Sequence, residues 1–277
     1  IKVAVWDNTS KITRYTAKTG TLPTNYSINY YEGMTLGEMW GYKCDGLFQS
    51  DEEAQTWANY SKFTNRSATW QAGDPRYLDL NGDGYVNNGN NTIYDHGDLV
   101  KIGNTTPRYS YSIQGGVRWN GIGISMMWQG VGKRDWYPAK ESGYFWGQYG
   151  RPYSMALPWH NSDRWSPTNR GAYWPRLVGY SASDSGLILA QPNTRYVQDA
   201  SYIRLKNLTI DYNFPKELVN KIGLQALKIY VSGENLLTFS PLKKYAKNYD
   251  PEGIYAGDAD YGTNKFGSDN FGDGDGY

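Results

Sequence analysis

A strict alternation of apolar and polar side chains begins after Pro107. One parity carries the polar residues Arg108, Ser110, Ser112, Gln114 and Arg118, and the other carries the apolar residues Tyr109, Tyr111, Ile113, Val117 and Trp119. Because successive side chains of a strand point to opposite faces, this period of two predicts a long strand with one apolar and one polar face. Asn120-Gly121 then predicts a tight hairpin turn. The alternation resumes on the return strand at Ile122, Ile124, Met126 and Trp128.

A second long hairpin is predicted further along the chain. The stretch from Tyr196 to Phe214 alternates as one strand, but its apolar parity switches, which predicts a β-bulge near Lys206-Asn207. Pro215 and the residues up to Gly223 predict a short helix. The alternation then returns through Leu227, Ile229 and Val231.

The segments between the hairpins have no sustained period. Residues 140–191 are rich in Trp, Tyr, Pro, Ser and Asn, residues 74–98 are rich in Gly, Asn and Asp, and residues 256–277 are rich in Gly and Asp. One further helix is predicted from Asp51 to about Lys62, because Ser50 and Glu53 form a capping box at its start.

Long two-faced strands with short connections at one end and very long loops at the other are typical of an outer-membrane barrel. We therefore predict an all-β fold that is part of a large antiparallel transmembrane β-barrel with long extracellular loops. The alternative is a secreted β-sandwich, in which the apolar face would be core. A sandwich has shorter strands with turns every eight to twelve residues or so, and loops of about fifty residues argue against it.

Composition supports strands and narrows the function. Aromatic residues make up 16% of the chain, with 26 Tyr and 11 Trp, and rings of this kind suit a membrane interface or a sugar-binding surface. With 28 basic and 27 acidic residues the net charge is +1, which lacks the basic footprint of a nucleic-acid-binding protein. The single cysteine, Cys44, has no neighbouring Cys or His at metal-ligand spacing.

The apolar residues are too dispersed for a membrane helix. The chain begins without the layout of a signal peptide, and no stretch approaches the ~20 consecutive apolar residues that a membrane helix needs. A barrel strand shows only about ten alternating residues, half of them polar. Because the mean hydropathy is low, much of the chain is expected to lie outside the bilayer in loops.

Five segments resemble, in the same order, motifs of the SusC/RagA family of TonB-dependent outer-membrane transporters. They are LGEMWGY with DGLFQSDEE (from Leu36), GD with DLNGDG and IGN (from Gly73), DRWSPTN with YWPRL (from Asp163), DASYIRLKNL (from Asp199) and SGENLLT (from Ser232). The family's N-terminal plug, its TonB-contacting segment and a closing strand are absent. Residues 1–277 are therefore interpreted as the C-terminal portion of one transmembrane β-barrel domain.

The resemblance also implies a function. It predicts import of oligosaccharides or peptides through a plugged barrel of about 22 strands in the outer membrane of a Gram-negative bacterium. It further implies a SusD-like surface lipoprotein as partner, TonB as energy source through the missing N-terminal part, and contact with outer-membrane lipid. The alternative function is a secreted, calcium-stabilised carbohydrate-binding β-domain.

The Asp-rich stretch predicts a structural calcium ion. Asp79, Asn81 and Asp83 are spaced two apart and followed by Gly84, as in the first half of an EF-hand loop. The turn at Gly84 would bring the Tyr85 carbonyl toward the same point. Position twelve lacks the closing acid, and the family pattern makes Asp98 the candidate final ligand. The alternatives that stay open are Asp95 as the last ligand, a contact from Asn87 through water, and an Asx-rich turn without any ion.

The long aromatic segment offers a candidate contact surface. Its rings stand near Asn, Asp and Arg side chains, which suits ligand or lipoprotein docking, although such rings also pack a loop's own core. The candidate contact residues are Trp159, Trp165, Tyr173 and Trp174. For catalysis we predict no site: His96 and His160 lie in no metal or triad motif, and nothing fixes the spacing of a carboxylate pair such as Asp163 with Glu141.

Overall fold

The computed structural model describes residues 1–23, 29–57, 70–139, 142–154, 156–179, 181–183 and 188–254. Strands dominate the secondary structure and the helices are short, which confirms the predicted all-β class. The chain divides into two compact units, the first of which comprises Ile1–Thr9, Pro107–Arg134 and Asp199–Lys243. Three predictions fall outside the described residues: the helix beyond Trp57, the carboxylate of Glu141 and the Gly/Asp-rich tail.

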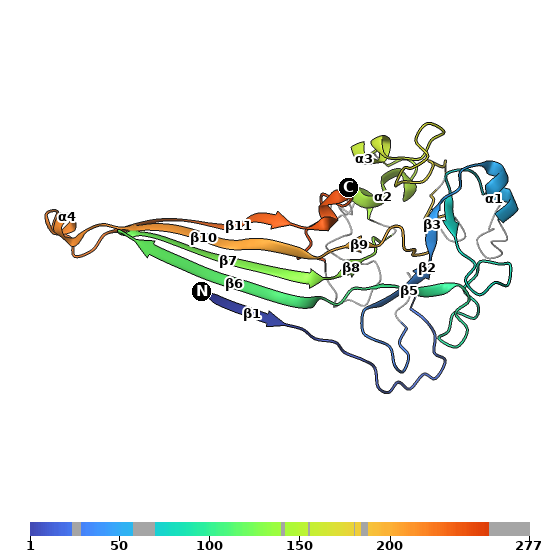
Figure 1. Ribbon diagram of the computed structural model, residues 1–277, viewed down its shortest axis with the longest axis horizontal. Helices are drawn as coiled ribbons and strands as arrows, with labels where there is room; N and C mark the ends of the chain where they lie inside the picture. Colours follow the sequence, from blue (N-terminus) through green and yellow to red (C-terminus); the bar gives the residue numbers. More distant parts are fainter. Residues whose placement is uncertain are drawn as a thin grey trace, which may run out of the picture. The chain divides into compact units, whose positions relative to one another are not determined.

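The first unit is a five-stranded antiparallel sheet (Figure 1). Its strands lie in the order β1-β6-β7-β10-β11. Their bounds are Lys2–Trp6 for β1, Arg108–Trp119 for β6, Ile122–Lys133 for β7, Tyr202–Asn213 for β10 and Lys228–Phe239 for β11. Four strands of twelve residues confirm the two predicted hairpins, and β1 is a neighbour that the sequence interpretation did not include.

The turn between β6 and β7 has the predicted Asn-Gly geometry. Asn120 and Gly121 have φ angles of 46° and 86°, and this left-handed pair matches the twist of the two flanking strands. The Asn213 amide donates to the Gly121 carbonyl at 2.8 Å, so the turn is also held by the end of β10.

The second hairpin differs from the prediction at its start and agrees in its middle. The strand begins at Tyr202 rather than at Tyr196, because the Ser201 amide donates to Asp199 Oδ1 in a local turn that interrupts the ladder. The predicted bulge is confirmed, since the register of β10 against both neighbours shifts between Leu205 and Asn207. Opposite the bulge, Asn235 of β11 has a φ of 53°.

The connection from β10 to β11 contains the predicted short helix. Helix α4 spans Lys216–Asn220, with Pro215 at its N-cap rather than inside its first turn. Gly223, which follows the helix, has a φ of 75°, a conformation that glycine adopts without steric cost.

The second unit comprises Ser10–Thr106, Asp135–Gln198 and the chain from Lys244 onward. It contains short two-stranded ladders that no long alternation announces: β2 (Glu38–Tyr42) with β5 (Leu99–Asn104), β3 (Cys44–Leu47) with β4 (Pro75–Tyr77), and β8 (Asp135–Trp136) with β9 (Gln198–Asp199). The helices elsewhere are α1 (Asp51–Trp57), α2 (Gly143–Trp146), α3 (Pro158–Ser162) and the 3₁₀ turns η1 (Gly147–Tyr149) and η2 (Pro241–Lys244). Each helix in the described part of the chain is too short or too polar to traverse a lipid bilayer.

Helix α1 is capped much as the sequence predicts. Ser50 Oγ accepts the Glu53 amide at 3.0 Å, which satisfies one free donor of the first turn. The Glu53 carboxylate reaches back at 2.6 Å to the amide of Gln49, one residue before the N-cap. The reciprocal half of the capping box is therefore shifted by one residue.

Aromatic rings form the interior of the second unit. Trp174 is fully buried and stacks on Tyr196 with ring centroids 5.8 Å apart, while Phe145 and Trp146 meet it edge to face. Burial of such rings removes a large apolar area from water, so this cluster stabilises a region with little regular secondary structure.

A buried ion pair fastens one loop of this unit to another. Asp74 has no exposed surface and accepts Arg176 Nε at 2.6 Å and Nη2 at 3.2 Å. Burial of the carboxyl group raises the pKa of Asp74 to about 6, against the lowering effect of Arg176. The Arg176 amide also donates to the Gly73 carbonyl, so backbone and side chain hold the same junction.

Candidate functional site

One face of the five-stranded sheet is apolar from edge to edge. Residues directly opposite each other in an antiparallel ladder point to the same face. The register therefore extends the apolar parity of β6 across the whole sheet. One such row is Val117, Ile124, Ile210 and Val231, and the next toward the hairpin turn is Trp119, Ile122, Tyr212 and Ile229.

This apolar face is open rather than packed as a core. Val117 is 66% exposed, and Trp119 and Val231 are each 73% exposed. In a sandwich these side chains would be the most deeply buried of the sheet. Their exposure differs from the buried core of a sandwich and leaves a large apolar surface on the described sheet.

Two aromatic borders delimit the apolar band. Tyr111 and Trp119 lie on the same face of β6 and are eight residues apart, about 27 Å along the strand, which is about 21 Å of height at a strand tilt of about 40°. Barrels in outer membranes carry an apolar band about 25 Å tall with aromatic residues at both borders. Tyr212 extends the aromatic border at the turn end, and Phe239 extends the one at the other end.

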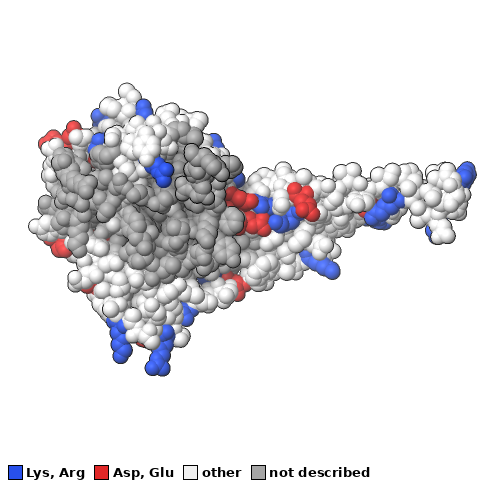
Figure 2. Space-filling view, turned by 180° about the vertical axis from the view of Figure 1, so that it is seen from behind, with Lys and Arg blue, Asp and Glu red and all other residues white. Residues whose placement is uncertain are grey.

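The opposite face of the sheet is polar. One of its rows contains Ser112, Gln129, Arg204 and Thr238. In that row the Arg204 Nε donates to Thr238 Oγ1 at 2.9 Å. The side of the sheet seen in Figure 2 is mostly uncharged and carries a few charged patches.

The clearest charged feature of the polar face is an ion pair that reaches over a glycine of the strand between its two partners. Arg118 of β6 and Asp211 of β10 form an ion pair at 2.5 Å, with Lys228 Nζ 3.7 Å from the same carboxylate. The pair spans the intervening strand β7 at Gly123, where a Cβ would lie 2.5 Å from both partners. The sequence interpretation missed this pair, because residues 93 positions apart in the chain meet only through the strand order.

The predicted calcium residues lie in one loop and order it through backbone amides. Asp79 accepts the Gly82 and Gly84 amides at 2.7 and 2.8 Å, and Asp83 accepts the Tyr85 amide at 2.8 Å. Asn81 accepts the Asp83 amide at 2.9 Å. Each of these oxygens keeps a second lone pair, and carboxylate and amide oxygens are the ligand type that a hard cation prefers.

Asp98, the candidate final ligand, lies beneath the loop and accepts backbone amides. It is fully buried, and its two oxygens accept the amides of Leu80, Asn81 and Asn87. Within the described ranges no group of three or more His, Cys, Asp or Glu side chains is arranged to hold a metal ion. Asp98 therefore fixes the two ends of the loop through backbone amides and does not join Asp79 and Asp83 in one ligand set. Asp95, the alternative, instead accepts the Asn90 amide at 3.1 Å.

The four candidate contact residues lie in or beside the aromatic interior of the second unit. Trp174 has no exposed surface, and its ring packs against other rings. Tyr173 stacks on Tyr245 with centroids 3.6 Å apart and accepts a hydrogen bond from Gln198. Trp165 is half-buried against Gly73, and Trp159 is half-buried beside Lys247.

The histidines have structural surroundings. His160 is buried with Nε2 at 2.7 Å from the Phe145 carbonyl and its ring against Trp174. Burial lowers the pKa of His160 to about 4, so the ring is neutral at pH 7. His96 lies beside the ring of Trp40. Burial likewise raises the pKa of the Cys44 thiol.

Comparison with curated proteins shows that the chain is similar to TonB-dependent receptors. It is 28% identical to TonB-dependent receptor P3 of Formosa agariphila over 235 residues, which is 84% of this chain and 20% of that protein. It is 27% identical to TonB-dependent receptor P26 of the same organism over 71% of the chain and 17% of that protein. The chain is a homologue of TonB-dependent receptors.

This TonB-dependent receptor homologue spans about a fifth of the length of the curated relatives it matches. It matches no established protein-family profile. Among solved structures, the RagAB peptide transporter aligns with 82% of this chain and 20% of its own at 17% identity, with a TM-score of 0.48. The RagAB peptide importer in its closed-closed state aligns with 81% of this chain and 22% of its own at 16% identity, with a TM-score of 0.49.

Proposed function

We propose that this chain forms part of the wall and extracellular loops of an outer-membrane β-barrel that imports oligosaccharides or peptides. The observation that carries the proposal is the open apolar face of the five-stranded sheet, which is continuous across all five strands. Long antiparallel strands with one apolar and one polar face suit a wall with lipid on one side and an aqueous lumen on the other. Homology to TonB-dependent receptors supports the same function.

The barrel must be completed by further strands. Strands β1 and β11 are the two edges of the sheet, and unpaired backbone groups at an edge are not tolerated in the hydrocarbon region of a membrane. We therefore propose that other segments of the full protein pair with both edges and close the barrel.

Two partners belong to this proposal. A SusD-like surface lipoprotein would cap the barrel and deliver ligand, and TonB would supply energy through an N-terminal plug. The support for both is the ordered set of motifs shared with the SusC/RagA family. In this scheme the chain has no catalytic task, and buried His160 contributes to packing.

A structural calcium ion is a further part of the proposal. The ion would be held by the side-chain oxygens of Asp79, Asn81 and Asp83 and by the Tyr85 carbonyl. Asp98 would anchor the loop through the backbone amides that it accepts. The ion would supply no chemistry to transport. It would neutralise two neighbouring carboxylates and hold a loop that is otherwise ordered by Asx-type hydrogen bonds.

The test is the migration of the full-length protein on a denaturing gel with and without boiling. A membrane barrel resists the detergent until it is boiled, so the unboiled sample should migrate anomalously and shift on heating. A secreted β-domain would give the same band in both lanes, and that outcome would overturn the proposal.

A further inference from the structure

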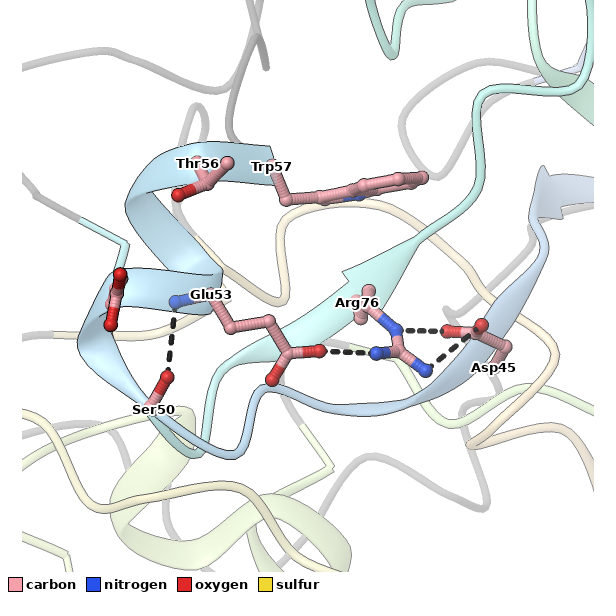
Figure 3. A pocket seen from close by; sticks show the side chains of 7 residues that line it. Asp45, Ser50, Glu53, Thr56, Trp57 and Arg76 are labelled. Carbon is pink, nitrogen blue, oxygen red and sulfur yellow. Dashed lines mark hydrogen bonds and ion pairs between the residues drawn. The ribbon is translucent and has the colours of Figure 1, made fainter.

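A pocket of about 500 Å³ opens in the second unit beside helix α1 (Figure 3). Strand β3 contributes Asp45 to its wall, and strand β4 contributes Arg76. The helix and the residue before it supply the remaining lining: Ser50, Glu52, Glu53, Thr56 and Trp57. Two strands and a helix thus build one concave site.

One wall of the pocket is a fixed ion network. Arg76 Nε lies 2.7 Å from Asp45 Oδ1, its Nη2 lies 3.1 Å from Oδ2, and its Nη1 pairs with Glu53. The Asp45 carboxylate raises the pKa of Arg76, so the guanidinium stays charged. Because the two acids engage the guanidinium on two sides, few of its donors remain for a ligand.

The opposite wall is the face of an exposed ring. Trp57 is 43% exposed, and its indole N–H donates to the Tyr77 carbonyl at 3.1 Å. This bond fixes the ring and uses its only donor, so the indole presents its π-face alone. Figure 3 shows the ring across the pocket from Glu53 and Arg76.

The lining carries surplus negative charge. Asp45, Glu52 and Glu53 are opposed by Arg76 alone, which leaves two uncompensated negative charges. Glu52 and Thr56 lie one helical turn apart, and within the described part of the chain neither side chain has a hydrogen-bond partner. An aromatic face beside free carboxylate oxygens suits a cation. A sugar would also need several donors, whereas the Trp57 N–H is used and most of the Arg76 N–H groups are engaged by Asp45 and Glu53.

We propose that this pocket binds the ammonium or guanidinium group of a lysine or arginine side chain in a peptide. The inference rests on the proposed function and narrows its substrate to peptides with a basic residue. The cation lies against the face of Trp57 and pairs with Glu52. The Asp45–Arg76–Glu53 network keeps the opposite wall of the pocket rigid.

The test is calorimetric titration of the detergent-purified full-length receptor with N-acetyl-arginine amide and N-acetyl-lysine amide. Both should bind, and binding should weaken at least tenfold in Glu52→Gln, which leaves an exposed helix position otherwise unchanged. Trp57→Leu should have a similar effect. Gln55→Ala, on the same helix but outside the pocket, is the matched control and should bind like the unchanged protein.

Three results would overturn the inference. The first is no binding of either cationic probe, and the second is binding of cellobiose or N-acetyl-glutamine amide that depends on Trp57. The third is equal weakening by Gln55→Ala, because the effect would then not come from the pocket. The boiled and unboiled gel is run on every variant. If the receptor forms a heat-modifiable barrel and imports substrate but binds neither cationic probe, this inference is wrong and the proposed function still holds.

Discussion

Ile113 and Ser112 are neighbours in β6 whose side chains point to opposite faces of the sheet. If the apolar face meets lipid, Ile113→Arg places a charge in the hydrocarbon region at a cost of roughly 2–4 kcal/mol near the midplane. Ser112→Arg places the same charge on the polar face and should be tolerated. The measurement is the fraction of full-length protein that forms a heat-modifiable barrel in isolated outer membranes. Equal losses in both variants would contradict the assignment of faces.

The buried pair of Asp74 and Arg176 predicts a pH dependence of stability. The folded-state pKa of Asp74 is about 6, above its ordinary value of 3.8. Between these values the folded protein binds more protons than the unfolded protein, so this group's contribution to stability is present below pH 3.8 and is lost as pH rises through 6. The span is worth about 3 kcal/mol, at 1.36 kcal/mol per pKa unit.

The comparison that isolates this effect is thermal unfolding of the full-length receptor and of Asp74→Asn between pH 4 and pH 7. The stability of the unchanged protein should fall relative to the variant as pH rises across this range. A constant difference between the two proteins would show that Asp74 titrates as an ordinary carboxyl group.

At the scale of elements, the bulge at Lys206 sets which residues of β10 face lipid. Deleting Lys206 makes Leu205 and Asn207 adjacent, as their β7 partners Trp128 and Met127 already are, so the other side chains of β10 keep their faces. This variant should still assemble on the boiled and unboiled gel. Inserting one residue between Thr209 and Ile210 instead exchanges the faces of the strand beyond it, since strand side chains alternate strictly, and should abolish assembly. Equal assembly of the two variants would contradict the assignment of faces.

The loop from Asp79 to Tyr85 is the element that the proposed calcium ion would hold. Terbium, a luminescent substitute for calcium, should bind the full-length receptor, and the exposed ring of Tyr85 is placed to sensitise its emission. The double change Asp79→Asn with Asp83→Asn removes both carboxylates and should abolish the signal. Glu217→Gln, on helix α4, should leave it intact. If the terbium signal survives in the double variant, the ion is not bound by this loop.

At the scale of the whole molecule, the proposed import needs an energy source and a delivery partner. Cells that lack TonB should assemble the full-length receptor normally and fail to accumulate its substrate. Cells that lack the proposed SusD-like surface lipoprotein should also assemble the receptor and take up its substrate more slowly. The measurements are uptake of labelled oligosaccharides or peptides and the heat-modifiable band. Full uptake without TonB would contradict the proposed mode of transport.

The described interior of the second unit limits what its aromatic loop can do in such a molecule. Trp174 lies inside a cluster with Phe145, Trp146 and Tyr196, so its substitution is expected to destabilise the unit rather than to change ligand choice. Partner or ligand contacts of this loop would fall to less buried rings such as Trp159 and Trp165.

The sequence by itself determined the long hairpins of this protein. Alternation over Arg108–Trp119 and the Asn120-Gly121 turn are local properties, because side-chain parity and left-handed backbone angles are decided within a few residues. The same holds for the bulge at Lys206, which the parity switch announces, and for the capped start of α1.

Only the tertiary structure decided which distant residues meet. The pairing of β1 with β6, the Arg118–Asp211 pair over Gly123 and the pocket built from Asp45, Trp57 and Arg76 all join residues far apart in the chain. Local sequence carries no signal for such contacts, since they depend on strand order and on how long loops pack. For the same reason only the structure shows that Asp98, assigned as a ligand from the family pattern, is buried and accepts the amides of Leu80, Asn81 and Asn87.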